Sequence, residues 1–358
     1  MVRVFETKRN DSTMTPRVST NVETLFFSIL ICDIITSMEN AILNFNKQFL
    51  FHPEVINSEN LQTPPEMLVI IGMGGSHLSG DVLKTLRPSI PVIIHSDYGL
   101  PALPESSMKK TLFVVSSYSG NTEETVDALT EAMNKGLHVV VITTGGKLLE
   151  IAQANSLPHI ILPDDGIQPR SALGYSIKAL AEISGDSSLK NELNDLSKLE
   201  PESFKKKGVR LAKLIKGKIP IVYSSVRYRS VAYNWKIKFN ETGKVPAFYN
   251  VFPELNHNEM TGFDVLDSNS FLSEKFIWLF IQGGEEHPQN QKRIKVTSEL
   301  LEERELETIL IKLQGSSVSE EVFSSLLIAD WASLQSANFY GVEAEEVPMI
   351  EEFKKRIQ

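Results

Sequence analysis

Short apolar runs, rich in β-branched and aromatic residues, alternate with helical patterns along most of this chain of 358 residues. The first group of expected strands lies at 67–71, 91–94, 112–116, 139–143 and 159–162. The second group lies at 219–224, 245–249, 276–281 and 308–313. Strands that alternate with helices form βαβ units, in which helices cover both faces of a mostly parallel sheet. The pattern therefore predicts an α/β protein built from two such halves.

The amino-acid composition changes between Gly185 and Glu202, where charged residues and serine replace large apolar residues other than leucine. Chains usually pass from one domain to the next in such polar segments. We therefore predict a first domain at 51–190 and a second domain at 200–358. The two series of strands share a rhythm but no sequence repeat, so internal pseudo-symmetry is inferred from the pattern alone.

Residues 1–50 are interpreted as an N-terminal extension that includes helices. Its first twenty residues are polar and of mixed charge, which is typical of a loose terminal segment. An apolar run at 25–35 is interpreted as a buried helix, because it is too short and too interrupted to span a bilayer. A targeting signal is the alternative for this run, although acidic residues precede it. A further helix is expected at 38–51.

The net charge of −9 and the isoelectric point near 5.4 argue against a nucleic acid or an anionic membrane as the partner. An anionic small substrate would therefore need local hydrogen-bond donors. Cys32 is the single cysteine, so no intrachain disulfide can form and no Cys/His cluster has the spacing of a zinc site. We expect a cytoplasmic protein that uses neither a metal nor a cofactor.

The hydroxyl-rich turn SSYSG at 116–120 follows an expected strand and leads into an expected helix. Asn121 is a good N-cap residue, and Glu124 completes a pattern like a capping box. Free backbone N–H groups and the helix dipole at such a turn attract phosphate, and the hydroxyls add donors. The turn is therefore a candidate phosphate site, with a well-capped βα turn of no function as the alternative.

A second turn of this kind, GMGGS at 72–76, follows the expected strand at 67–71. His77 occupies the position where a dinucleotide-binding fingerprint requires its third glycine. The lysine that a P-loop requires after its glycines is also missing. Two such turns at the ends of parallel strands favour one compact phosphate over a nucleotide.

The segment from Trp235 to Glu259 holds the densest run of chemically capable side chains. Glu241 is expected at the C-terminal end of a helix, where the negative end of the dipole favours its use as a general base. His257 is expected in a turn after a strand, where Asn256 and Asn258 are placed to orient its ring. The alternatives are a solvated helix end for Glu241 and a surface role for His257.

Other charged residues complete the set of candidates. Arg170 lies in the segment QPRS, just before an apolar helical pattern. A fixed guanidinium there would stabilise a developing oxyanion, or it would simply pair with a carboxylate. Glu254 and Glu259, the carboxylates nearest to His257 in sequence, are interpreted as residues that orient the turn.

Five ordered motifs carry a resemblance to a known family. They are GMGGSHLSGD (72–81), SSYSGNTEET (116–125), QPRSALGY (168–175), NETGK (240–244) and PELNHNEM (253–260). This set resembles that of the bifunctional phosphoglucose/phosphomannose isomerases, which belong to the sugar isomerase (SIS) domain superfamily. The similarity covers roughly Leu68 to Ile357. It implies two SIS domains, each a parallel sheet between helices, and a homodimer whose active sites lie near the subunit interface.

The resemblance also implies roles for individual residues. The residues that it assigns to the substrate phosphate are Gly75, Ser76, Ser117, Ser119 and Thr122. It implies that Glu241 is the base, that His257 is contributed by the partner subunit, and that Arg170 lies beside the enediolate. Gln335 is a departure, because some members carry a lysine near this position. An amide can donate a hydrogen bond but brings no charge, so Gln335 is kept as a candidate substrate contact.

The function predicted from these residues is that of an aldose–ketose isomerase. It would interconvert glucose 6-phosphate, mannose 6-phosphate or both with fructose 6-phosphate by a metal-independent proton transfer through a cis-enediol. The alternatives are a phosphosugar-binding SIS protein without catalysis and an isomerase of another sugar phosphate. An amidotransferring hexosamine-phosphate synthase is excluded for this chain, because its glutaminase domain needs a nucleophilic N-terminal cysteine.

Overall fold

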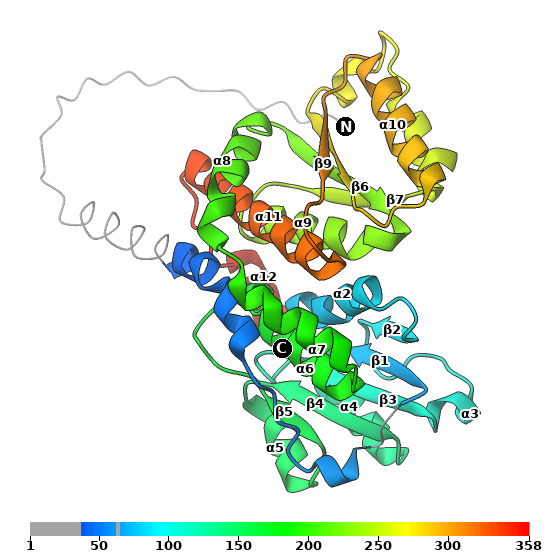
Figure 1. Cartoon of the computed structure of the whole chain (residues 1–358), viewed down its shortest axis with the longest axis vertical. Coiled ribbons are helices and arrows are strands. Elements are labelled where there is room, and N and C mark those ends of the chain that lie inside the picture. Colours follow the sequence, from blue (N-terminus) through cyan, green and yellow to red (C-terminus); the bar gives the residue numbers. More distant parts are fainter. Residues whose placement is uncertain (1–36, 62–64, 358) are drawn as a thin grey trace, which may run out of the picture.

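The computed structural model describes residues 37–61 and 65–357, and it contains two parallel β-sheets flanked by helices (Figure 1). The first sheet has five strands in the order β2-β1-β3-β4-β5. Their bounds are Met67–Ile71 (β1), Val92–His95 (β2), Thr111–Ser116 (β3), His138–Thr143 (β4) and His159–Ile161 (β5). Ile70 of β1 pairs with Ile94 of β2 and Val114 of β3, and every neighbouring pair in this sheet is parallel.

The second sheet has four parallel strands in the order β7-β6-β8-β9. Their bounds are Ile219–Ser225 (β6), Phe248–Phe252 (β7), Phe276–Gln282 (β8) and Thr308–Lys312 (β9). In each sheet the first strand of the series, β1 or β6, lies between the two strands that follow it. The two halves therefore share one strand topology, and the first sheet adds β5 at its far edge.

Helices connect the strands and cover both sheets. In the first half they are α2 (Leu78–Leu86), α3 (Glu105–Met108), α4 (Glu123–Asn134), α5 (Gly146–Ala154), α6 (Leu173–Ser184) and α7 (Ser187–Asp195). In the second half they are α8 (Lys205–Leu214), α9 (Arg229–Glu241), α10 (Pro288–Glu302), α11 (Val318–Tyr340) and α12 (Pro348–Ile357). A helix at 37–43 and the 3₁₀ helix η1 (Phe45–Leu50) precede β1.

The first sheet is buried on both faces because its apolar side chains alternate between two cores. Val69 packs in an outer core with Leu129 of α4 and Leu148 of α5. Ile70, the next residue along β1, belongs to a central core on the opposite face. Successive side chains of a strand point to opposite faces, so a strand that is apolar throughout must be covered on both sides.

The central core joins the two halves into one packed unit. Leu83 of α2, Trp235 of α9, Leu279 of β8 and Phe323 of α11 all belong to it. Helix α2 of the first half contacts α9 of the second half, and the two lie next to each other in the middle of the molecule (Figure 1). The outer face of the second sheet has a smaller core of its own, which includes Ile294 of α10.

The strands agree with the sequence analysis to within one residue at most ends, and the exception is β7. The expected strand at 245–249 is wrong in its position, because β7 occupies Phe248–Phe252. Val245 and Ala247 are buried, but they lie in a loop that contains Pro246. The apolar pattern therefore indicates burial and not extended structure, since burial does not require a strand and proline cannot donate to a ladder.

The N-terminal helices are tested only in part. The helix expected at 38–51 is confirmed, as a helix at 37–43 followed by η1. The loose segment at 1–20 and the apolar helix at 25–35 lie outside the described residues. Among the residues that are described, no helix is both long and apolar enough to cross a membrane.

The segment 185–202, which the sequence analysis interprets as the junction between the two domains, contains helix α7. Leu189 and Leu193 of α7 are buried in the central core.

Helices α8 and α11 approach closely at Gly208. A Cβ added at this position would lie 2.9 Å from both the backbone nitrogen of Ala332 and the carbonyl oxygen of Ile328. We expect Gly208→Ala to destabilise the protein by about 1–3 kcal/mol, because two helix backbones would have to separate. At an exposed helical site the same change would stabilise it. Gly262→Ala is the matched control, since nothing lies within 4 Å of a Cβ built at Gly262. Urea unfolding of both variants measures the difference, and equal stabilities would contradict this packing.

Candidate active site

The first glycine turn packs directly against the segment that carries Arg170. Gly74–His77 forms the 3₁₀ helix η3 after β1, and Pro169–Ser171 forms the 3₁₀ helix η4. A Cβ on Gly75 would lie 2.8 Å from the backbone nitrogen of Arg170 and 2.8 Å from the carbonyl carbon of Pro169. Only glycine permits this approach of two backbones. The turn after β1 is therefore held beside the arginine.

The two predicted phosphate turns lie side by side and are joined by their hydroxyl groups. The Oγ atom of Ser76 accepts a hydrogen bond from the N–H of Tyr118 at 3.0 Å. The Ser117 Oγ and Thr122 Oγ1 atoms are 2.9 Å apart, and Ser117 Oγ also accepts from the N–H of Gly120 at 3.1 Å. A hydroxyl that accepts in this way keeps its own proton for a ligand, so Ser76 is bonded to the protein and remains a donor. Ser119 is exposed.

Several backbone N–H groups of these turns are open to an anion. Those of Gly75, Ser119, Thr122, Glu123 and Glu124 donate to no acceptor among the residues that the structure describes. The last three belong to the beginning of α4, where the helix dipole also favours negative charge. This combination of orphan N–H groups and hydroxyls is the physical basis of phosphate binding at a helix N-terminus.

The predicted capping of this helix was wrong by one residue. Helix α4 begins at Glu123, so Thr122 and not Asn121 is its N-cap residue. Asn121 instead serves the next helix, because its Oδ1 atom accepts from the N–H of Lys147 in the first turn of α5 at 3.1 Å. The correction places the hydroxyl of Thr122 at the helix end, next to Ser117.

Arg170 is 4% exposed, and its side chain uses all five N–H donors within the protein. Nε donates to Oγ1 of Thr242 at 3.0 Å, and Nη2 donates to the carbonyl oxygens of Ala344 and Glu345 at 3.0 and 2.9 Å. Nη1 makes two longer contacts, with Gln168 Oε1 at 3.5 Å and Glu241 Oε2 at 3.4 Å. Burial lowers the pKa of Arg170, and the carboxylate of Glu241 opposes that shift.

Glu241 is the last residue of α9, as predicted from the sequence. Its side chain is 26% exposed, and its Oε2 atom faces Arg170. Because Gly75 contacts the backbone of Arg170 and the guanidinium contacts Glu241, the carboxylate and the phosphate turn are separated by one arginine side chain. The structure therefore brings together Gly75, Ser76, Ser117, Thr122, Arg170 and Glu241.

Lys244 is a site residue that the sequence analysis did not select. Its ammonium group donates to the carbonyl oxygens of Glu241 and Glu346, with Ala344 at 3.5 Å. Burial, and then the positive charge of Arg170, lower the pKa of Lys244. The signal was present in the motif NETGK, which places both Thr242 and Lys244 within three residues of Glu241.

His257 lies in the turn after β7, at the end of the 3₁₀ helix Glu254–His257, and its side chain is exposed. Within the described residues its side chain makes no hydrogen bond or ion pair, and it therefore does not contact Glu241 of the same chain in either way. The roles predicted for Asn256 and Asn258 were wrong. Asn256 donates to Thr297 at 2.9 Å, and Asn258 donates to Glu254 at 2.8 Å, so neither orients the imidazole.

Glu254 and Glu259 hold the turn together, as predicted, since Glu254 accepts from Asn258 and Glu259 bonds Asn250 and Tyr223. Gln335 lies on α11, is half-buried, and makes no side-chain hydrogen bond among the described residues. No group of three or more His, Cys, Asp or Glu side chains in the described part of the chain is arranged to hold a metal ion.

The bond between Thr242 and Arg170 can be tested by removing one hydroxyl. We expect Thr242→Val to cost about 1–3 kcal/mol of stability, because it leaves the buried Nε–H of Arg170 without an acceptor. Thr242→Ser keeps the hydroxyl and is the matched control. Urea unfolding measures both variants, and a serine variant that loses as much stability as the valine variant would show that the methyl group, not the hydrogen bond, matters.

Comparisons with known proteins find relatives over most of this chain. The model described as the bacterial phospho-glucose isomerase C-terminal SIS domain matches residues 204–357. A bifunctional phosphoglucose/phosphomannose isomerase of Aquifex aeolicus is 33% identical over 303 residues, which cover 83% of this chain and 92% of that protein. One of Caldicellulosiruptor bescii is 34% identical over 310 residues, with 82% and 89% covered. A D-glucosamine-6-phosphate 4-epimerase of Sulfolobus acidocaldarius is 30% identical over 299 residues, with 81% and 89% covered.

Solved structures resemble the fold over nearly the whole chain. A hypothetical protein of Thermus thermophilus superposes with a TM-score of 0.65 at 18% identity, covering 93% of this chain and 95% of that one. At that identity the likeness shows the fold alone. The sequence relatives decide the family, because they match at 33–34% identity across both halves. The chain belongs to the family of bifunctional phosphoglucose/phosphomannose isomerases.

Proposed function

We propose that this chain interconverts glucose 6-phosphate, mannose 6-phosphate or both with fructose 6-phosphate. One observation carries the proposal. The phosphate turn contacts the backbone of Arg170, and the side chain of Arg170 ends on Glu241. The candidate anion site and the candidate base are thus separated by one arginine side chain. This spacing suits a phosphorylated hexose that is held at one end and reacts at the other.

The phosphate would bind to Gly75, Ser76, Ser117, Ser119 and Thr122. The support for this assignment is that the N–H groups of Gly75, Ser119 and Thr122 have no acceptor among the described residues, and that the hydroxyls converge. Binding energy from the phosphate, which does not react, can then be used to orient the reacting carbons. The turn at 72–76 alone would not bind the phosphate in this way, because Ser76 is its one hydroxyl residue.

Glu241 would remove the proton from C2 and return it to C1, through a cis-enediol. Its side chain is partly exposed and contacts Arg170, which supports a base that substrate can reach and whose position is fixed. Arg170 would stabilise the enediolate oxygen through Nη1, the nitrogen whose present contacts are longest. Glucose and mannose 6-phosphate differ only at C2, so both lead to the same enediol. Gln335 remains a candidate substrate contact.

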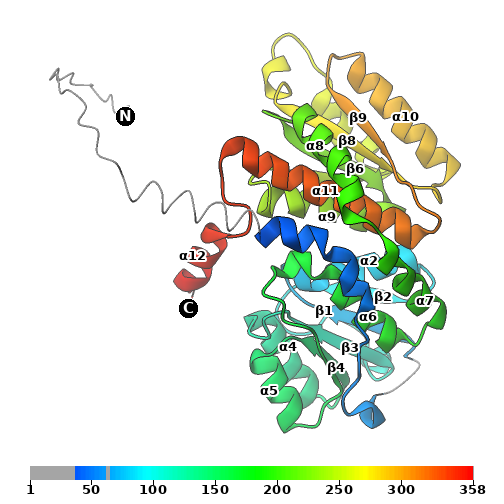
Figure 2. The same ribbon diagram turned by 60° about the vertical axis from the view of Figure 1, so that its left-hand side comes forward.

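His257 would open the sugar ring by transferring a proton between the ring oxygen and the C1 hydroxyl. We infer that it acts in the site of a partner subunit of a cytoplasmic homodimer. Two observations support the dimer. His257 is exposed, and α12 carries exposed apolar side chains at Met349, Ile350, Phe353 and Ile357. Figure 2 shows α12 at the side of the molecule, away from both sheets.

An isomerase of another sugar phosphate is the second candidate. The observation that favours it is Gln335, a neutral amide near the position where some members of the family carry a lysine. One relative at 30% identity is named for a reaction of an amino sugar phosphate. The same turns would hold the phosphate in either case, so the two candidates differ only in the sugar that is turned over.

The base assignment predicts a loss of turnover without a loss of binding. We expect Glu241→Gln to lower kcat for both aldoses by about 10²–10⁴-fold, because general base catalysis contributes this much. KM should change far less. Glu302→Gln is the matched control, since Glu302 is the last residue of α10 as Glu241 is of α9. A coupled assay of fructose 6-phosphate formation, with chelator present, measures both. Near wild-type turnover by Glu241→Gln would remove this residue from the mechanism.

If two chains associate through α12, the activity of the protein depends on this helix. We expect Phe353→Glu to convert a dimer into monomers and to abolish most activity, because a monomer would lack the His257 of its partner. Lys355→Glu, a charge change on the same helix, should leave the assembly intact. Sedimentation velocity gives the mass of each variant, and the coupled assay gives its activity. A wild-type protein that is fully active as a monomer would exclude the shared site.

A further inference from the structure

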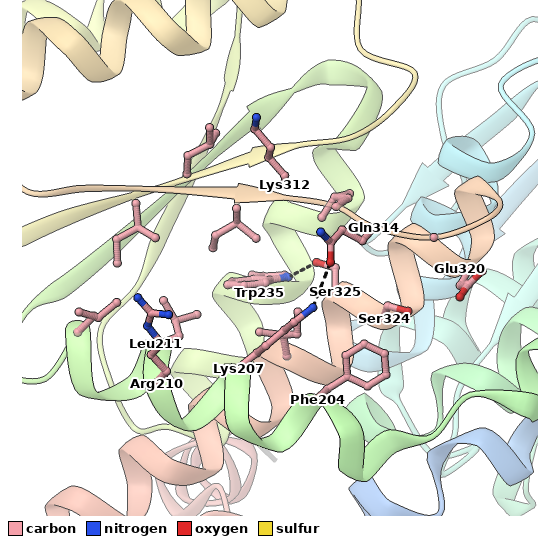
Figure 3. Close-up of a pocket in the computed structure, with 17 residues that line it drawn as sticks. Phe204, Lys207, Arg210, Leu211, Trp235, Lys312, Gln314, Glu320, Ser324 and Ser325 are labelled. Atoms are coloured by element: carbon pink, nitrogen blue, oxygen red, sulfur yellow. Dashed lines mark hydrogen bonds between the residues drawn. The ribbon is translucent and has the colours of Figure 1, made fainter.

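A cavity of about 690 Å³ lies beside the open edge of the second sheet (Figure 3). Strand β9 forms one wall, helix α8 forms the opposite wall, and α9 and α11 contribute Trp235 and Ser325 to its floor. In the first sheet the corresponding strand, β4, is covered by β5. The second sheet has no fifth strand among the described residues, and the cavity lies next to β9. Its volume is that of pockets that enclose small organic molecules.

The floor of the cavity is apolar. Leu211 of α8, Ile309 and Leu313 provide aliphatic surface, and Trp235 provides an indole. The indole N–H already donates to Ser325 Oγ at 2.9 Å, so the ring offers the cavity an apolar face without an unmet donor. Ser324 adds a hydroxyl that makes no hydrogen bond among the described residues. Such a floor favours an aromatic or aliphatic body.

The rim of the cavity is positively charged. Lys207, Arg210 and Lys312 line it, and none of them forms an ion pair within the described residues. Lys207 donates to the neutral amide of Gln314 at 3.1 Å, which leaves its charge uncompensated. The one carboxylate in the lining, Glu320, lies at the far end in Figure 3 and accepts from Ser316. This local excess of cations lies on a protein whose net charge is −9.

We propose that this cavity binds an organic anion that carries one acidic group on an aromatic or aliphatic body. The cations of the rim would hold the acidic group, and the floor would bury the body. The cavity is separate from the candidate active site, because neither Arg170, nor Glu241, nor any residue of the two Gly/Ser turns lines it. A second copy of this chain fits the rim poorly, because a two-fold contact would place its lysines and arginine against themselves.

Anilinonaphthalene sulfonate is a suitable probe, because it joins an aromatic body to one acidic group and fluoresces when its surroundings are apolar. We expect the full-length protein to bind one molecule per chain. The double variant Arg210→Glu/Lys312→Glu should raise the Kd about tenfold or more, while its thermal unfolding and its isomerase activity stay unchanged. Lys213→Glu is the matched control, since Lys213 is exposed on α8 but does not line this cavity. It should change the Kd less than twofold.

Four outcomes would overturn the proposal. The first is equal binding of the probe by the double variant and by Lys213→Glu. The second is equally tight binding of the uncharged analogue phenylnaphthylamine, which would show that charge plays no part. The third is a change of mass in sedimentation caused by Leu310→Glu, because Leu310 is exposed on this face and the change would show that a second copy covers it. Displacement of the probe by glucose 6-phosphate would likewise place it in the active site.

Discussion

The candidate site depends on one buried guanidinium, that of Arg170. It joins three parts of the chain that are distant in sequence: the segment after β5, the C-terminal end of α9, and the segment between α11 and α12. Removing an arginine from water is costly unless its donors find acceptors. Here five acceptors surround it, so the same bonds that compensate for burial also fix Glu241 relative to the phosphate turns. Stability and site geometry have a common origin in this residue.

The two halves share a strand topology, yet within the described residues only the first carries a candidate anion site of this kind. In the second sheet the equivalent corner lies between the ends of β6 and β8, and Tyr228 fills it. The ring of Tyr228 occupies the space that any Cβ on Gly283 would need, and its hydroxyl accepts from the N–H of Glu285 at 3.1 Å. Glu286 is buried nearby, and burial raises its pKa. The ring of Tyr228 fills the corner of the second sheet where a phosphate would bind, and the carboxyl group of Glu286 is buried beside it.

The sequence was sufficient for the features that depend on local pattern. Apolar β-branched runs predicted the strands, and the Gly/Ser motifs predicted the turns that follow β1 and β3, because both follow from residues close together in the chain. It was insufficient where tertiary contacts decide. Asn121 is a residue type that often caps helices, and it lies just before α4. Its side chain instead accepts a hydrogen bond from the N–H of Lys147 in α5. Asn256 and Asn258 flank His257 in sequence, but their partners are Thr297 and Glu254. Lys244 was missed because its acceptors include a carbonyl 102 residues away.

The pattern of distances around Arg170 indicates how a fully bonded side chain can still serve a substrate. Nε and Nη2 make bonds of 2.9–3.0 Å to buried or backbone acceptors, and losing these would separate segments of the fold. Nη1 makes only contacts of 3.4 and 3.5 Å, to the side chains of Glu241 and Gln168. In the proposed mechanism a substrate oxygen would replace these contacts without disturbing the others, and the same exchange would release Glu241 toward the sugar. In the proposed mechanism Gln335 would bring no charge, so Arg170, together with Lys244 at the carbonyl oxygen of Glu241, would supply positive charge beside the enediolate.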